Sequence, residues 1–226
     1  MTKEARFEMF AFWRTSATYR ARVAFNLKGV KADERFVNME AGENRSAAFL
    51  EINPLGAIPA VIDREAGKPT PPITQSLAIL EFLDELYPAP PLLPKEVHER
   101  ARVRSLASML VADTHPLITP RVIKYLTNNL QLSPEQIHAW RTNWFGTGLQ
   151  AFEQRLATEA ETGVFCHGDR ITIADICLAS IKVVMPIFKV EVPNTPIIDR
   201  IFAACQGHEA FAQAAPHRQA GAPAQS

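Results

Sequence analysis

The stretch that decides the fold lies near the N-terminus, where residues 7–29 read FEMFAFWRTSATYRARVAFNLKG. The apolar, aromatic run over residues 7–13 is typical of a strand, and it stops at Thr15 and Ser16, whose short hydroxyl side chains suit a helix N-cap. Apolar residues then recur at every fourth position from Tyr19 to Leu27, which indicates a helix. The stretch therefore predicts a strand, a tight turn and a helix, with functional groups collected at the turn.

The chain after this stretch completes a small α/β unit. Residues 34–39 predict a second strand, and a short helix follows near residues 46–50. The extended segment 57–62 contains Pro59, which implies an edge strand, a bulge or a cis peptide bond. A short strand near Ile73 then leads into a helix over residues 77–87, opened by Ser76.

Four prolines within residues 88–94 mark a change of architecture, because this composition cannot continue a helix and often joins domains. The later sequence has helical period, with helices expected at about 97–128, 134–160, 173–184 and 196–204. Capping boxes begin at Ser133 and Thr172. The fold class is therefore α+β, with domains over 1–88 and 95–215 and a disordered tail over 216–226.

Composition excludes several classes of protein. The 226 residues carry 24 basic and 24 acidic side chains, so the chain has no net positive charge that would attract nucleic acid or an anionic membrane. Apolar runs are too short to span a bilayer, and the charged N-terminus is unlike a secretory signal, which predicts a cytoplasmic location. The three cysteines and six histidines show no metal-ligand spacing, so we expect no metal and reduced, buried thiols.

Four segments together resemble the zeta class of glutathione transferases. They are FWRTSATYRARVA at 12–24, NPLGAIP at 53–59, QSLAI at 75–79 and GDRITIAD at 168–175. The resemblance covers nearly the whole chain. It implies a thioredoxin-like first domain, an all-helical second domain, glutathione as cofactor and a homodimer.

Within that class, His115-Pro116-Leu117 and RVIKYL at 121–126 look like the fourth-helix segment of maleylacetoacetate and maleylpyruvate isomerases. The resemblance implies glutathione-dependent cis–trans isomerisation of a maleyl keto acid, a small dicarboxylate from the breakdown of aromatic compounds such as tyrosine. Ala17 stands where many zeta enzymes have a cysteine, which argues against reactions that need a second thiol. Two alternatives stay open: a general transferase for small electrophiles such as halogenated acids, and a non-catalytic glutathione-binding scaffold.

Glutathione acts as a nucleophile only as a thiolate, so the site needs a donor for the sulfur. A hydroxyl at a helix N-terminus provides a hydrogen bond and the positive end of the helix dipole, and both Thr15 and Ser16 qualify. We prefer Ser16 slightly, because it lies at the expected helix start.

The resemblance assigns the remaining contacts to glutathione. Ile58, before Pro59, presents its backbone to the cysteinyl part, as an added strand does. Gln75 and Ser76, at a helix start, bind the γ-glutamyl carboxylate. Asn44 stands where the family has a glutamine at the glycyl end.

A substrate with two carboxylates calls for arginines, which bind such groups through two parallel hydrogen bonds. Arg14, beside the thiolate turn, and Arg121, on a helix, are the candidates. His115 is either a hydrogen-bonded helix histidine or a further substrate-binding residue. Asp175, in contrast, is expected to cap a helix and take no part in catalysis.

Overall fold

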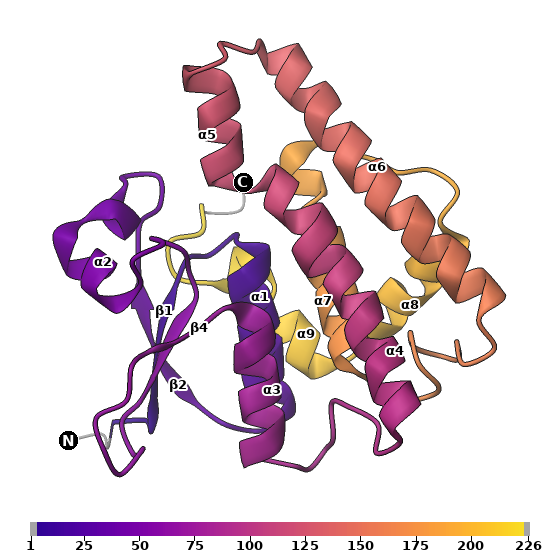
Figure 1. Cartoon of the computed structure of the whole chain (residues 1–226), viewed down its shortest axis with the longest axis horizontal. Coiled ribbons are helices and arrows are strands. Elements are labelled where there is room, and N and C mark those ends of the chain that lie inside the picture. The colour runs from indigo at the N-terminus through magenta and orange to yellow at the C-terminus, as the bar shows by residue number, and fades with distance from the viewer. Residues whose placement is uncertain (1–3, 224–226) are drawn as a thin grey trace. The chain divides into compact units, whose positions relative to one another are not determined.

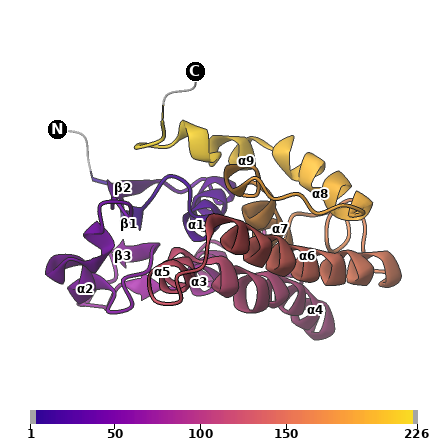
Figure 2. The same cartoon turned by 90° about the horizontal axis from the view of Figure 1, so that it is seen from above.

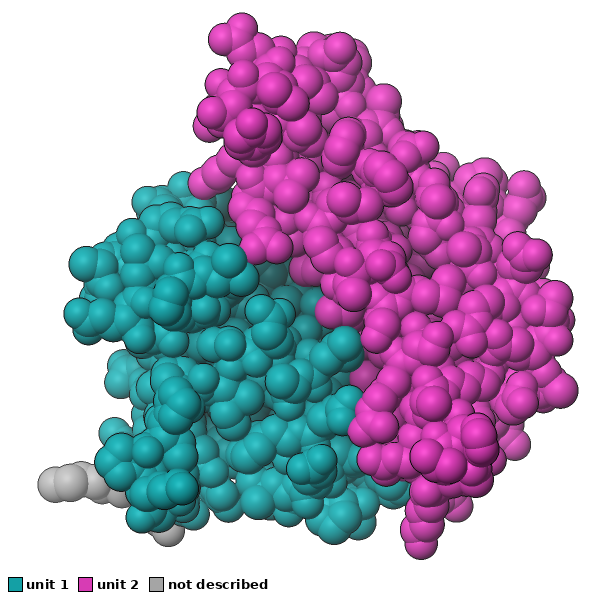
Figure 3. All heavy atoms as spheres, in the orientation of Figure 1, with its two compact units in different colours: residues 1–91, 208–226 teal, residues 92–207 magenta. Residues whose placement is uncertain are grey.

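A computed structural model describes residues 4–223 of the chain. The chain divides into two compact units, which Figure 3 colours separately: residues 1–91 with 208–226, and residues 92–207. The expected α+β class is confirmed, because the first unit contains a mixed four-stranded sheet with helices and the second is helical.

The first unit is built on a sheet with strand order β2-β1-β3-β4; Figure 1 labels β1, β2 and β4, and Figure 2 labels β3. Strand β1 runs parallel to β2 and antiparallel to β3, which runs antiparallel to β4. The elements of this unit are β1 (Phe7–Ala11), α1 (Ser16–Leu27), β2 (Ala32–Phe36), α2 (Ala47–Ile52), β3 (Ala60–Asp63), β4 (Ile73–Thr74), α3 (Ser76–Leu86) and α9 (Glu209–Gln213).

Helices cover both faces of this sheet, and β1 places aromatic side chains on each. Successive side chains of a strand point to opposite faces. Phe7 contacts Phe25 of α1 and Phe82 of α3, whereas Phe10 contacts Phe49 of α2. Helices α1 and α3 lie on one face of the sheet and pack against each other, and α2 lies on the opposite face. The apolar residues of this strand are thus fully buried on one side and partly buried on the other, where Glu8 interrupts the run.

The second unit is a set of helices in which α7 packs against both α4 and α8 (Figure 2). Asp175, fully buried in the first turn of α7, accepts hydrogen bonds from the backbone N–H of Cys166 at 2.7 Å and of Thr172 at 2.8 Å. Both expected capping boxes are confirmed. The elements of this unit are α4 (Val97–Ser108), α5 (Pro120–Asn128), α6 (Pro134–Thr158), α7 (Ile173–Lys182) and α8 (Pro196–Gln206).

The helix expected over 97–128 is interrupted. Helix α4 ends at Ser108, a π-helical turn spans Met109–Thr114, and a 3-10 turn spans His115–Ile118 before α5 begins. Proline explains the break just before α5, because Pro120 lacks the N–H that continues a helix and disfavours helical geometry in the residue before it. Thr119, just before Pro120, accordingly has extended backbone angles (φ −66°, ψ 152°).

The C-terminal segment belongs to a different unit from the one that the sequence predicted. Residues 208–215, expected in the helical domain, belong to the first unit, where α9 packs against α1 and Asn26 Nδ2 donates to the carbonyl of Ala210 at 2.9 Å. The expected disordered tail includes a 3-10 turn over Pro216–Arg218, in which Pro216 is buried. Residues 224–226 of that tail lie outside the described residues.

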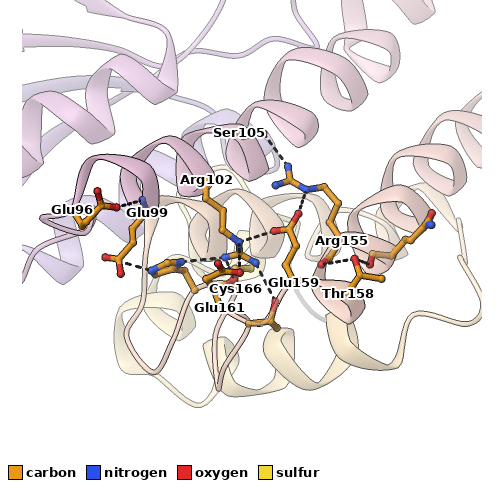
Figure 4. Close-up of polar contacts among 12 residues, drawn as sticks. Glu96, Glu99, Arg102, Ser105, Arg155, Thr158, Glu159, Glu161 and Cys166 are labelled. Atoms are coloured by element: carbon orange, nitrogen blue, oxygen red, sulfur yellow. Dashed lines mark hydrogen bonds and ion pairs between the residues drawn. The ribbon is translucent and has the colours of Figure 1, made fainter.

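A cluster centred on Arg102 ties α4 to the end of α6 (Figure 4). Arg102 Nε donates to Glu159 at 2.6 Å, and Arg102 Nη1 donates to the carbonyl of Cys166 at 2.8 Å. Arg155 Nε donates to the other oxygen of Glu159 at 2.5 Å. Burial acts to raise the pKa of Glu159, but the hydrogen bonds from Arg155 and Arg102 outweigh it and hold the pKa below its ordinary value.

We expect Glu159→Gln to lower the free energy of unfolding by about 1 kcal/mol at pH 7. Because the folded-state pKa is depressed, this contribution is present above the ordinary glutamate pKa and is lost as the pH falls through the lower native value. Urea titrations at several pH values measure this difference in the free energy of unfolding between variant and wild type. Glu161→Gln is the control, since that carboxylate lies 3.7 Å from Arg102 and is half exposed. Equal effects of the two variants at every pH would contradict the assignment.

Candidate functional site

The register of the sheet brings three predicted segments to one edge. Ala60, the first residue of β3, pairs with Phe10 near the end of β1 and with Thr74 at the end of β4. The turn after β1, the segment before β3 and the start of α3 therefore emerge side by side. These positions hold Thr15 and Ser16, Ile58 and Pro59, and Gln75 and Ser76.

The turn after β1 presents two hydroxyl groups with different partners. Thr15 is the N-cap of α1: its Oγ1 accepts from the N–H of Thr18 at 3.3 Å and donates to the hydroxyl of Thr18 at 2.6 Å. Ser16 is the first residue of the helix and is buried, and its hydroxyl forms no hydrogen bond with another described residue. The Ser16 hydroxyl is thus available to a ligand at the positive end of the helix.

The segment before β3 is held by two asparagine side chains. Asn44 Nδ2 donates to the carbonyl of Gly56, and Asn53 Nδ2 donates to that of Ala57, each at 2.7 Å. Gly56 has φ +63°, and a Cβ there would lie 2.7 Å from the carbonyl oxygen of Asn44, so the loop requires glycine. Asn44, expected at the glycyl end of a ligand, therefore also shapes the segment that precedes Ile58.

This anchoring leaves the backbone of Ile58 without an internal partner. The Ile58-Pro59 peptide bond is cis. Neither the N–H nor the carbonyl of Ile58 bonds to another of residues 4–223, although the residue is buried and its side chain packs with Phe12. Buried backbone N–H and carbonyl groups almost always have a hydrogen-bond partner. The N–H and carbonyl of Ile58 are therefore suited to hydrogen-bond an extended peptide ligand.

The start of α3 is the third part of the site. Gln75, the N-cap, makes no side-chain capping bond and has φ 68° and ψ 116°, a conformation that non-glycine residues seldom adopt. No acidic residue stands in the first turn of α3. Uncapped N–H groups at a helix start attract an anion.

Two buried arginines of α1 support the site, and sequence reasoning assigned them no role. Arg22 donates from Nε and Nη2 to the two carboxylate oxygens of Glu34 at 2.8 and 2.7 Å, and its Nη1 lies 3.4 Å from the carbonyl of Trp13. It thus fixes the turn against β2. Arg20 donates from Nε to Ser76 Oγ at 2.8 Å. Charged side chains two residues apart in an otherwise apolar helix are the signal that could have identified them.

The predicted substrate-binding residues occupy both units. Arg14 forms an exposed ion pair with Glu40 at 2.7 Å, and its guanidinium lies over the ring of Trp13. In the second unit, Arg121 is exposed in the first turn of α5 and forms no ion pair with another described residue. His115 is half-buried at the start of the 3-10 turn.

The protein's own thiols all belong to the second unit. Cys166, Cys177 and Cys205 form no disulfide and are buried in the second unit. Burial raises the pKa of the Cys166 thiol, with Asp175 adding to the effect, and burial likewise raises the pKa of Cys205. Such thiols are poor nucleophiles, so a thiolate at the turn has to come from a ligand.

The described residues contain neither a metal-binding side-chain cluster nor a membrane-spanning helix. No group of three histidine, cysteine or acidic side chains among residues 4–223 is arranged to hold a metal ion. No helix in the same range is both long and apolar enough to cross a bilayer.

Comparison with known proteins places the chain in a family. Residues 5–85 match the N-terminal domain of glutathione S-transferase. A probable maleylacetoacetate isomerase of Vibrio cholerae is 38% identical over 93% of this chain and 96% of its own length. A solved maleyl pyruvate isomerase, described as a bacterial glutathione S-transferase in the zeta class, is 35% identical, covers 96% of this chain and all of its own, and has a TM-score of 0.90. The chain belongs to the zeta-class glutathione transferases.

A third protein is similar to this zeta-class chain along the same length. It is a maleylacetoacetate isomerase from Methylobacterium extorquens AM1, solved with bound malonate and glutathione. It is 45% identical and covers 96% of the zeta-class chain and 100% of its own, with a TM-score of 0.92. The thioredoxin-like first domain and helical second part expected of the zeta class are confirmed.

Proposed function

We propose that this zeta-class protein is a glutathione-dependent cis–trans isomerase of a maleyl keto acid, maleylacetoacetate or maleylpyruvate, in the breakdown of aromatic compounds. The observation that carries the proposal is the unpaired backbone of Ile58, placed between the hydroxyl turn and the uncapped start of α3. Relatives named as isomerases of these two acids, one of them solved with glutathione and a dicarboxylate, support it.

The residues at the sheet edge fit glutathione part by part. The amide and carbonyl of Ile58 pair with the cysteinyl residue as a neighbouring strand does. Gln75 and Ser76 hold the γ-glutamyl carboxylate at the start of α3, where uncapped N–H groups face an anion. Asn44 stabilises the loop beneath and lies toward the glycyl end.

Glutathione, when bound, supplies a thiolate that adds reversibly to the cis double bond, so that the bond can rotate before the thiolate leaves. The Ser16 hydroxyl, or that of Thr15 once it turns from Thr18, holds that sulfur as an anion by donating a hydrogen bond, aided by the dipole of α1. Arg22 keeps the turn in place by binding the carbonyls that precede it.

Arg14 and Arg121 bind the substrate's carboxylates and stabilise negative charge that develops on its carbonyl oxygen. Arg14 can exchange Glu40 for a substrate carboxylate at little cost, because an exposed ion pair contributes at most about 1 kcal/mol. Arg121 has no carboxylate partner among the described residues to give up. His115 is a further substrate-binding residue in this proposal.

We further propose that the protein acts in the cytoplasm as a homodimer, as its resemblance to the zeta class implies. Sedimentation equilibrium at micromolar concentration should give twice the chain mass of 25.1 kDa. A mass of one chain at that concentration would contradict the dimer.

The hydroxyl turn is tested by Thr15→Ala, Ser16→Ala and the double variant. Loss of a hydrogen bond to a charged sulfur should lower kcat for a maleyl acid about ten- to a hundredfold, with circular dichroism unchanged. A shift of the bound thiol's pKa to higher values, followed by thiolate absorbance, should accompany the loss. If the double variant kept full activity, neither hydroxyl could have the assigned role.

The arginines are tested by Arg14→Met and Arg121→Met, which keep much of the side-chain length and remove the hydrogen-bond donors. We expect the kcat/KM for a maleyl acid to fall about tenfold relative to that for an uncharged aryl halide. Lys68→Met, an exposed change in the loop before β4, should leave this ratio unchanged. An unchanged ratio in both arginine variants would favour the general transferase over the isomerase.

A further inference from the structure

Arg20 is a charged side chain placed inside the first unit. It lies in α1, is 1% exposed, and is the largest fully buried side chain among the described residues. Burying a guanidinium removes strong hydration, so such a residue is kept only where its N–H groups are well used. One of them, Nε–H, donates to Ser76 Oγ at 2.8 Å, across the interface between α1 and α3.

This hydrogen bond determines how the Ser76 hydroxyl can act. A serine hydroxyl has one hydrogen to donate and two lone pairs to accept. Because Arg20 donates to the oxygen, the hydroxyl hydrogen must point elsewhere, and it donates to no other described residue. A cationic donor also polarises the O–H group and strengthens the bond that it can give. Ser76 is thus prepared to donate to an anion.

The surroundings of Ser76 favour a carboxylate as that anion. Helix α3 has 11 residues, and its N-cap Gln75 supplies no side-chain capping bond. The backbone of Gln75 is held at φ 68°, a costly conformation that persists only where the fold requires it. Ser76 itself is 4% exposed, so Arg20 acts on its hydroxyl in a poorly hydrated region where electrostatic interactions are strong.

We infer that Arg20 is a positioning residue for the γ-glutamyl α-carboxylate of glutathione, acting through the Ser76 hydroxyl that it orients and polarises. The inference rests on the proposed use of glutathione and adds a residue of α1 to the binding of its carboxylate. It predicts that Arg20 determines selectivity for that carboxylate more than affinity for the rest of the peptide.

The test compares two peptides by calorimetry: glutathione, and 4-aminobutyryl-cysteinylglycine, which differs only by lacking the γ-glutamyl α-carboxylate. The wild-type protein should bind glutathione at least about tenfold more tightly. Arg20→Met should reduce this preference about ten- to a hundredfold or abolish it, while changing the affinity for the analogue little. Arg20→Lys should restore part of the preference, because it keeps the charge without the planar fork of donors.

Arg22→Met is the matched control, since Arg22 is a buried arginine of the same helix whose partner is Glu34. Its loss should affect both peptides alike and leave the preference intact. Should Arg20→Met not fold, Ser76→Ala takes its place and should also reduce the preference, because Arg20 acts through that hydroxyl.

Other outcomes overturn the inference in distinguishable ways. Equal weakening of both peptides by Arg20→Met, or full preference in Ser76→Ala, would leave glutathione binding in place and remove the role of Arg20. Failure of the wild-type protein to bind either peptide would contradict the proposed function itself.

Discussion

Ala60 pairs on one side with Phe10 and on the other with Thr74, and the site depends on this register. Shifting a strand by one residue turns every side chain to the other face. Such a shift of β1 would move the fully buried Phe7, Met9 and Ala11 to the face where Glu8 forms its ion pairs, so their burial favours the observed alignment. Three loops distant in sequence are thereby brought to one edge, where the packing of Phe12 with Ile58 and the hydrogen bond from Arg20 to Ser76 join them.

Around that edge, charged and amide side chains act mainly on the backbone. Arg22 binds carbonyls of the turn, Asn44 and Asn53 bind carbonyls of the loop before Pro59, and Thr15 binds an N–H of α1. These bonds satisfy the loop groups that a sheet would otherwise pair. The backbone amide and carbonyl of buried Ile58 have no such partner among residues 4–223, and a rigid scaffold that presents these two groups is suited to a peptide ligand.

Much of this arrangement was predictable from the sequence, because the signals were local. Apolar periodicity located β1, α1 and α3, and capping residues located the start of α7, whereas the second strand was expected at 34–39 instead of Ala32–Phe36 and α9 was not predicted. What could not be predicted depends on contacts across the fold. Nothing in the sequence near Arg20 reveals that its partner is Ser76, 56 residues away. The π-helical turn after α4 likewise has no local signal in the sequence. Placement of the site residues as ligand contacts stays a prediction.

The packing of α9 against α1 has a consequence for how the protein is made. Residues 208–218 complete the first unit, although 116 residues of the second unit, 92–207, precede them in the chain. During synthesis, the N-terminal sheet and its helices leave the ribosome long before the segment that covers one side of α1. The first unit therefore reaches its final form only after the second has been translated, which ties together the folding of two units that each have their own core.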